Sequence, residues 1–124
     1  MSVNSNTYVV FGIKLDYDEL YDKIENSNKE DLWEELLDKY RESAFGPAKE
    51  DFSIIPDGMD GEYVVIGKVL DKTEVYESFP GFANLTISDA EKIEVMSKIM
   101  NLMEELEVVI LHDFPKLLVF THYT

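Results

Sequence analysis

A nine-residue segment that occurs twice decides the fold. The first copy is Tyr8-Val9-Val10-Phe11-Gly12-Ile13-Lys14-Leu15-Asp16, and the second is Tyr63-Val64-Val65-Ile66-Gly67-Lys68-Val69-Leu70-Asp71. The copies lie 55 positions apart without a gap, and later matches are Glu19 with Glu74 and Tyr21 with Tyr76. Such self-similarity indicates a duplicated unit, about residues 7–56 and 62–124 of one 124-residue domain. The alternative is two strands that converged on similar residues.

Each copy predicts a strand that leads into a helix. Tyr, Val, Ile and Phe favour strands, and the shared Gly12 and Gly67 indicate a bulge or a close approach of two backbones. The repeated Asp-x-x-Glu spacing, at 16–19 and again at 71–74, is typical of a helix N-terminus, because an aspartate there accepts hydrogen bonds from free amides.

Two longer helices are expected after Ser27 and Ser88, each of which precedes a glutamate by three positions. Apolar residues at helical spacing follow both serines. The first stripe is Leu32, Trp33, Leu36, Leu37 and Tyr40, and the second is Ile93, Met96, Ile99, Met100, Met103 and Leu106. The methionines of the second stripe fit a core, and an adaptable binding surface is the alternative.

The expected order is strand, helix, strand, turn, strand, helix, strand. Strands are predicted at 52–55, 63–70 and 116–121, with a shorter one at 108–111 and a turn at 56–61. This order predicts an α+β fold of the ferredoxin-like, split βαβ type, with a four-stranded antiparallel sheet and two main helices on one face. The other face would stay open for a ligand or partner, and 72–87 would form a short helix and loop of its own.

Composition excludes several classes of protein. The chain has 26 acidic and 11 basic residues, a net charge of −15, so a broad basic surface for direct nucleic-acid binding is not expected. With 45% apolar residues it is too hydrophobic for a disordered acidic tail. It has no cysteine, no visible secretory signal and no apolar run long enough to span a membrane. We therefore expect a cytoplasmic protein, in the host cytoplasm if it is phage-encoded.

No motif for catalysis, a metal or a cofactor is recognisable. His112 and His122 lack a nucleophilic partner in sequence, and we expect them to be buried with a partner or on the surface. Asp57, Asp60 and Glu62 in the turn could hold a divalent cation weakly, but a solvated turn explains them as well. The sequence therefore predicts a protein that is not an enzyme and needs no cofactor or metal.

Negative charge is densest between Asp16 and Glu42, where 11 acidic and four basic residues give a net charge of −7. The expected exposed helix face carries Glu34, Glu35, Asp38 and Glu42, which we predict to contact a basic partner. Phe79 and Phe82 flank a turn and are predicted to anchor a partner. Solubility is the alternative for the acids, and packing under a loop is the alternative for the two phenylalanines.

These features predict a small acidic binding protein that inhibits or sequesters a basic partner. Its strongest form is a nucleic-acid mimic that antagonises a nucleic-acid enzyme, as small phage-encoded antagonists and immunity proteins do. The alternative is a module that sequesters a small molecule or nucleotide on the open sheet face or at a homodimer interface. Lys14, Lys68 and Lys116 are the basic residues on strands that could serve that alternative.

Overall fold

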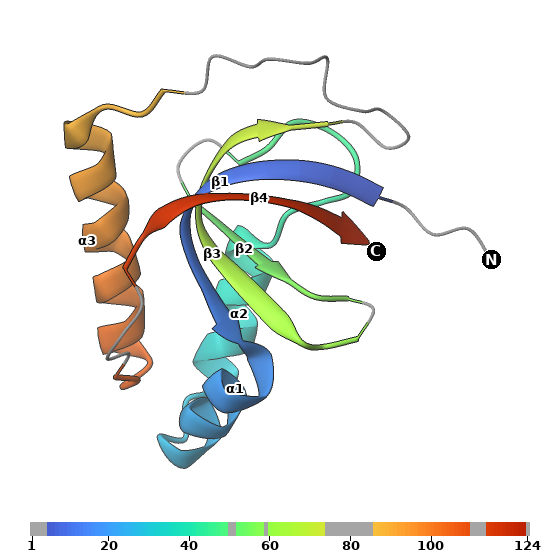
Figure 1. Cartoon of the computed structure of the whole chain (residues 1–124). Coiled ribbons are helices and arrows are strands. Elements are labelled where there is room, and N and C mark those ends of the chain that lie inside the picture. Colours follow the sequence, from blue (N-terminus) through green and yellow to red (C-terminus); the bar gives the residue numbers. More distant parts are fainter. Residues whose placement is uncertain (1–4, 50–51, 59, 74–85, 110–113, 124) are drawn as a thin grey trace.

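The structure is a computed structural model, and it describes residues 5–49, 52–58, 60–73, 86–109 and 114–123 (Figure 1). Its elements, in chain order, are strand β1 (Ser5–Asp16), helices α1 (Tyr17–Asn26) and α2 (Glu30–Tyr40), strands β2 (Ser53–Pro56) and β3 (Tyr63–Lys72), helix α3 (Asp89–Glu105) and strand β4 (Lys116–Tyr123). None of the helices in these ranges is long and apolar enough to span a membrane.

The four strands form one sheet in the order β2-β3-β1-β4, and all neighbouring strands are antiparallel. This confirms the predicted α+β class with a four-stranded antiparallel sheet. The described chain has three helices where two main ones were expected, because the short helix that begins after Asp16 is a full element of ten residues.

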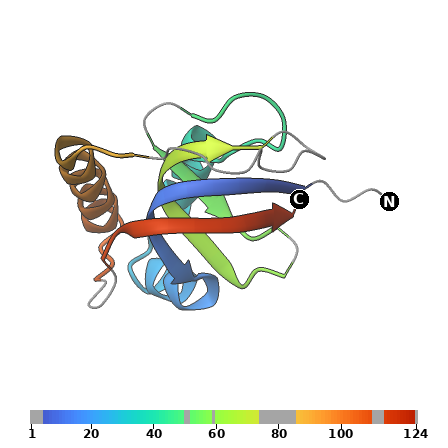
Figure 2. The same ribbon diagram turned by 45° about the horizontal axis from the view of Figure 1, so that its top comes forward.

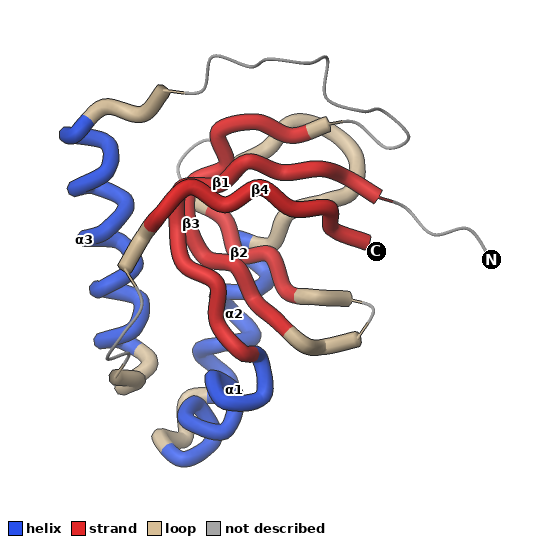
Figure 3. The backbone as a smooth tube through the Cα atoms, in the orientation of Figure 1, coloured by secondary structure: helices blue, strands red, loops and turns tan. Residues whose placement is uncertain are grey.

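The repeated glycines lie opposite each other on the two central strands, where Gly12 pairs with Gly67. A Cβ atom on Gly12 would lie 2.7 Å from the Gly67 Cα atom, and one on Gly67 would lie 2.6 Å from the Gly12 Cα atom. The predicted close backbone approach is therefore confirmed, and no larger residue fits at either position without movement of the backbone. Both β1 and β3 bend strongly along their length (Figure 3).

The main core lies between one face of the sheet and all three helices. The sheet contributes alternate residues of β1 and β3, among them Phe11, Ile13 and Ile66. The helices contribute Leu20 and Ile24 from α1, Trp33 and Leu37 from α2, and Val95, Ile99, Leu102 and Met103 from α3. Because residues of every helix meet the same strand face, the helices form one layer over the sheet.

The face of the sheet without helices holds a second, smaller core. Its buried members are Tyr8, Val10, Ile55, Val65 and Val69, with Leu118, Phe120, Tyr63 and Ala48 packed against them. The segment after α2 covers part of this face: the Asn6 amide donates to the Ala44 carbonyl at 2.9 Å, and the Lys72 ammonium donates to the Gly46 carbonyl at 3.1 Å. Less of this face is therefore exposed than the prediction of an open binding surface implied.

Two of the four predicted helix caps are confirmed. Asp16 accepts a hydrogen bond from the Glu19 amide at 3.0 Å, and Ser88 accepts one from the Glu91 amide at 3.1 Å. Ser27 was wrongly predicted as a cap: it ends α1, its hydroxyl donates to the Glu107 carbonyl, and α2 begins after Lys29 without a side-chain cap.

The Asp71 cap is also wrong. Strand β3 continues through Asp71 to Lys72 and does not give way to a helix there. It can continue because β1 still provides pairing partners, Val9 for Asp71 and Tyr8 for Lys72. Residues 74–85 lie outside the described ranges, so the short helix expected there is not addressed, and neither are residues 110–111 of the predicted short strand. Its first residues, 108–109, are not in a strand.

The apolar stripe predicted on α3 was only partly correct. Ile99, Met103 and Leu106 are buried as expected, but Ile93 and Met100 are 64% and 68% exposed. Val95 and Leu102 are buried in their place. The face in contact with the sheet is thus rotated from the predicted stripe, and the other apolar residues of α3 face solvent.

Candidate partner-binding surface

Helices α1 and α2 present one acidic surface, which we call the α1–α2 surface. Its exposed carboxylates are Asp18, Glu19, Asp22, Glu25, Asp31, Glu34, Glu35 and Asp38. Three of the four acids predicted to bind a partner, Glu34, Glu35 and Asp38, therefore lie together on it. Within the described ranges, the ion pairs join Lys68 to Glu91, Lys92 to Asp89 and Lys98 to Glu94, so none neutralises this surface.

The carboxylates of the two helices act on a common point. Burial raises the pKa of Tyr21 above its usual value of 10.0, and Glu25 of α1 together with Glu30 and Glu34 of α2 raises this pKa further. Acids from both helices thus produce one negative field over Tyr21. The Tyr21 ring stacks on Tyr17 with 6.3 Å between centroids, so an aromatic pair lies among these carboxylates.

Glu42 was wrongly predicted as the fourth acid of this helix face, because it does not lie on α2. Helix α2 ends at Tyr40, and Glu42 follows in extended chain, where its amide donates to the Ile54 carbonyl at 3.3 Å. Burial raises the pKa of the Glu42 carboxyl, while Lys72 and Lys49 act to lower it. Because its charge raises the pKa of Tyr8, Glu42 belongs to the helix-free side of the sheet.

The predicted aromatic anchors, Phe79 and Phe82, lie outside the described residues. Among the described residues, Phe45 and Phe114 are exposed phenylalanines. The stacked Tyr17 and Tyr21 are the aromatic pair among the acids of α1 and α2, and both pack partly against the main core. The sequence signal for them was the spacing of four positions on a helix, which places two side chains on one face.

A polar cluster on the helix-free face was not predicted. The Tyr63 hydroxyl and the Nδ1 atom of the buried His122 are 3.0 Å apart. Burial lowers the pKa of His122, and burial followed by the charge of Asp57 raises the pKa of Tyr63 to about 12. His122 thus has a hydrogen-bond partner, as one of the two sequence interpretations held. No sequence pattern could pair residues 59 positions apart.

The turn carboxylate considered for a cation has a structural role. Asp57 accepts hydrogen bonds from the amides of Asp60 at 3.3 Å and Glu62 at 3.1 Å, which holds the turn between β2 and β3. In the part of the chain that the structure describes, no three His, Asp or Glu side chains gather in a way that could hold a metal ion.

The strand lysines proposed for ligand binding are not brought together. Lys14 lies over the Tyr63 ring, 5.5 Å from its centroid, beside a cavity of about 270 Å³ on the helix-free face. Lys68 faces the helices, where it pairs with Glu91 at 3.5 Å. Lys116 is exposed at the start of β4. These three lysines therefore do not form one binding site.

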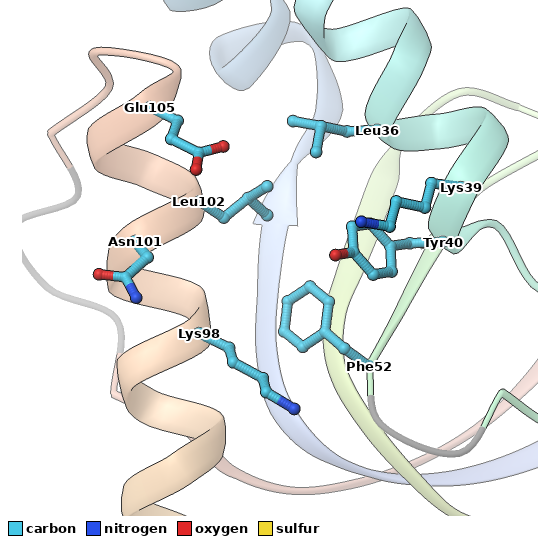
Figure 4. A pocket seen from close by; sticks show the side chains of 8 residues that line it. All are labelled: Leu36, Lys39, Tyr40, Phe52, Lys98, Asn101, Leu102 and Glu105. Atoms are coloured by element: carbon cyan, nitrogen blue, oxygen red, sulfur yellow. The ribbon is translucent and has the colours of Figure 1, made fainter.

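A larger cleft of about 400 Å³ lies between α2 and α3 (Figure 4). Its floor is apolar, with Leu36, Leu102 and Phe52, and the Tyr40 ring meets Phe52 edge to face at 5.5 Å. Lys39 from α2 and Lys98 from α3 extend into it from opposite walls (Figure 4). Glu105 and Asn101 complete the lining.

Neither a protein-family model, a curated protein nor a solved structure matches this chain.

Proposed function

We propose that the chain is an acidic binding protein that inhibits or sequesters a basic partner through the α1–α2 surface. One observation carries this proposal: eight exposed carboxylates lie on α1 and α2, and no lysine or arginine of the described ranges forms an ion pair with them. Solubility alone needs no such concentration on one side. A net negative field of this kind raises the association rate of a positively charged surface.

The α1–α2 surface is suited to bind an arginine side chain of a partner. A guanidinium group can lie on the Tyr17–Tyr21 pair while it donates hydrogen bonds to a neighbouring carboxylate such as Glu25 or Glu34. Tyr17 and Tyr21 are already held by stacking at 6.3 Å, so little side-chain freedom is lost when such a contact forms.

We propose a nucleic-acid-binding enzyme as the class of partner. Helix α2 carries five acids in 11 residues. At 1.5 Å per residue that is one carboxylate per roughly 3.3 Å of helix axis. One strand of duplex DNA carries a phosphate per about 3.4 Å. A groove built to bind phosphates would therefore meet a similar linear charge density on this helix, as expected for a nucleic-acid mimic of the phage or immunity type.

The test is affinity capture from the lysate of the native host, with three versions of the chain at low and high salt. The variant Glu34→Gln/Glu35→Gln/Asp38→Asn removes three charges from the α1–α2 surface, and Glu104→Gln/Glu105→Gln/Glu107→Gln removes three exposed charges from the end of α3 and beyond. We expect the wild type and the α3 control to retain a nucleic-acid-binding protein at low salt and to release it when duplex DNA competes. The α2 variant should not retain this protein. Equal retention by both variants would contradict the proposal.

A second candidate function, the sequestering of a small molecule or nucleotide, is favoured by the α2–α3 cleft. Its volume of about 400 Å³ lies within the usual range for ligand pockets, whereas the cavity of about 270 Å³ beside Lys14 lies below it. A planar ring could pack on Phe52 and Tyr40 while an anionic group meets Lys39 and Lys98. Thermal-shift assays with a nucleotide panel should then show stabilisation that Lys39→Gln/Lys98→Gln abolishes and Lys116→Gln keeps. No stabilisation of the wild type would remove this candidate.

We also propose that the fold is the ferredoxin-like one and arose by duplication. In a split βαβ arrangement each parallel pair of strands encloses one strand of the other unit, which leads to the order β2-β3-β1-β4. The register of the central strands supports the duplication. Phe11 pairs with Lys68, and the residues at the equivalent positions of the other half, Ile66 for Phe11 and Ile13 for Lys68, also pair with each other. Gly12 and Gly67 are themselves equivalent and pair with each other, as a two-fold relation between the halves requires.

A further inference from the structure

The two edges of the sheet differ in how they are protected. Strand β2 is four residues long and ends in Pro56, and Arg41 forms a bridge to Ile54 while the Glu42 amide donates to the Ile54 carbonyl. A short strand, a proline and a covering segment are the usual means by which proteins block an edge. The β2 edge is thus closed by the chain itself.

Among the described residues, the β4 edge lacks such protection except at its last residue, Tyr123, which Gly58 of the turn between β2 and β3 approaches. Strand β4 has eight residues, is the outermost strand beside β1 (Figures 1 and 2), and contains no proline. Its pairing with β1 runs from Ser5 opposite Tyr123 to Gly12 opposite Lys116 without a shift in register. Its only formal charge is on Lys116, at one end, although the whole chain carries −15. A long, regular, nearly uncharged edge of this kind is a template for another strand.

Exposed apolar side chains border this edge. On β4, Leu117 and Val119 lie opposite Phe11 and Val9 and so point to the helix side, where they are 51% and 67% exposed. On α3, the exposed residues Ile93, Met96 and Met100 are spaced by three and four positions, so they form one stripe. Lys98, Asn101 and Glu105 line the cleft toward α2, which places the apolar stripe on the other flank of α3, away from α2. We call these five apolar residues and the outer edge of β4 the β4 edge surface.

We propose that the β4 edge surface binds a second copy of this chain, with the two β4 strands antiparallel about a two-fold axis. An isologous contact needs a surface that is complementary to itself, and an antiparallel pair of identical strands meets this condition. Two −15 chains repel each other, so they can meet only where charge is lowest, and Leu117–Tyr123 carries no formal charge. A basic foreign partner would instead prefer the acidic α1–α2 surface.

The proposed contact involves one strand edge and five apolar side chains of each copy. Pairing joins two four-stranded sheets into one of eight strands and covers the open part of the β4 edge in each copy. It also brings the five apolar side chains of each copy to the same side of the joined sheet. A standard interface buries about 800 Å² per partner. The accessible surface of this chain is 7789 Å², so such a contact would take about a tenth of it.

Salt separates this interaction from the proposed function. Screening weakens the repulsion between two chains of like charge, so dimerisation should strengthen as salt rises. Binding of a basic partner to the α1–α2 surface should weaken over the same range. Failure of the dimer would leave the α1–α2 proposal unaffected, and the reverse is also true.

Sedimentation equilibrium over about a hundredfold range of concentration tests the proposal, because a dimer shows mass action. Val119→Lys places a charge at the centre of the edge, and we expect it to raise the dimer dissociation constant at least about 100-fold. Phe45→Lys is the matched control, because Phe45 is 61% exposed, lies after α2 rather than at the edge, and undergoes the same charge change. A monomeric wild type at every concentration and salt would overturn the proposal, as would equal effects of the two variants.

The absence of cysteine in the chain provides a second readout. Single cysteines introduced at Leu117, Val119 and Thr121 sample successive positions of β4 on the helix side, and at least one should form an intermolecular disulfide on mild oxidation. Phe45→Cys should not. Cross-linking at Phe45 with none on β4 would place the contact elsewhere and refute the proposal.

Discussion

Gly12→Ala should destabilise the protein strongly, because the added Cβ atom meets the backbone of the neighbouring central strand. It would lie closest to the Ile66 carbonyl oxygen and 2.7 Å from the Gly67 Cα atom, whereas an ordinary contact begins near 3.4 Å, so the strands must separate locally by at least about 0.7 Å. Hydrogen bonds near 2.9 Å would lengthen to roughly 3.6 Å, which no longer counts as a bond.

Two such bonds beside the glycine pair, each lost with buried groups left unsatisfied, amount to about 3–5 kcal/mol. The lower entropy of alanine in the unfolded chain offsets only about 0.4–1 kcal/mol of this. Because small domains are stable by about 5–15 kcal/mol, the variant should unfold at much lower urea concentration and melt at least roughly 10 °C lower.

The assay is urea unfolding followed by circular dichroism and by the fluorescence of Trp33, the single tryptophan. Gly58→Ala is the matched control, because its Cβ atom would find its nearest neighbour, the Tyr123 carbonyl oxygen, at 3.8 Å. We expect the control to stay within about 0.5 kcal/mol of the wild type. A Gly12→Ala protein within about 1 kcal/mol of the wild type would refute the close approach of the two strands.

Three further predictions concern protonation and helix caps. Burial lowers the pKa of His122 below 6.5, so the unfolded chain takes up the proton at a higher pH than the folded chain does. The stability of the wild type relative to His122→Gln should therefore decline below about pH 6.5. A constant difference in melting temperature between the two proteins from pH 8 to 5 would contradict this. Glu25→Gln/Glu34→Gln should lower the pKa of Tyr21 toward 10.0 but not to it, because the contribution of burial remains. NMR titration of the Tyr21 ring measures this pKa. An unchanged pKa would exclude a field shared by the two helices. Asp16→Ala and Ser88→Ala should each reduce the free energy of unfolding by about 1 kcal/mol, because each removes a helix N-cap. Ser27 caps no helix N-terminus, so Ser27→Ala should reduce this free energy by less. The urea midpoints of the three variants test both expectations.

Local patterns predicted most of the elements because their causes are local. The repeated segment predicted both central strands, since Val, Ile and Tyr alternate over a sheet with both faces covered. Asp16 and Ser88 were found as caps because a cap bonds to an amide only three residues away.

The errors arose where tertiary contacts decide. Ser27 has the spacing of a cap, but its hydroxyl bonds to the Glu107 carbonyl, 80 positions away. On α3 apolar residues cover a wider arc than the sheet can bury, and periodicity alone could not choose Val95 and Leu102 over Ile93 and Met100. Glu42 continues the acidic run in sequence, but α2 ends before it and the chain leaves the helix face.

The acidic face of α2 could be predicted from charge density alone, whereas the joint action of two helices on Tyr21 could not. That action depends on the turn at 27–29, which positions α1 and α2 so that Glu30 and Glu34 influence a residue of α1. The polar pair of Tyr63 and His122 was equally beyond reach. Strand pairing places Tyr63 opposite Asp16 and His122 opposite Asn6, ten positions apart on β1, so the curvature of the sheet must bring them together.

The most direct test of the central claim is an NMR titration of the chain with an arginine-rich peptide, with every backbone amide followed at low and high salt. Helix α3 serves as an internal control, because it also carries exposed acids, including Asp89 and Glu104. We predict that the shifted resonances concentrate on α1 and α2 around Tyr17, Tyr21 and Glu34, and that the effect falls steeply as salt rises. Shifts spread evenly over α3 and the α1–α2 surface, or none on the latter, would contradict the account.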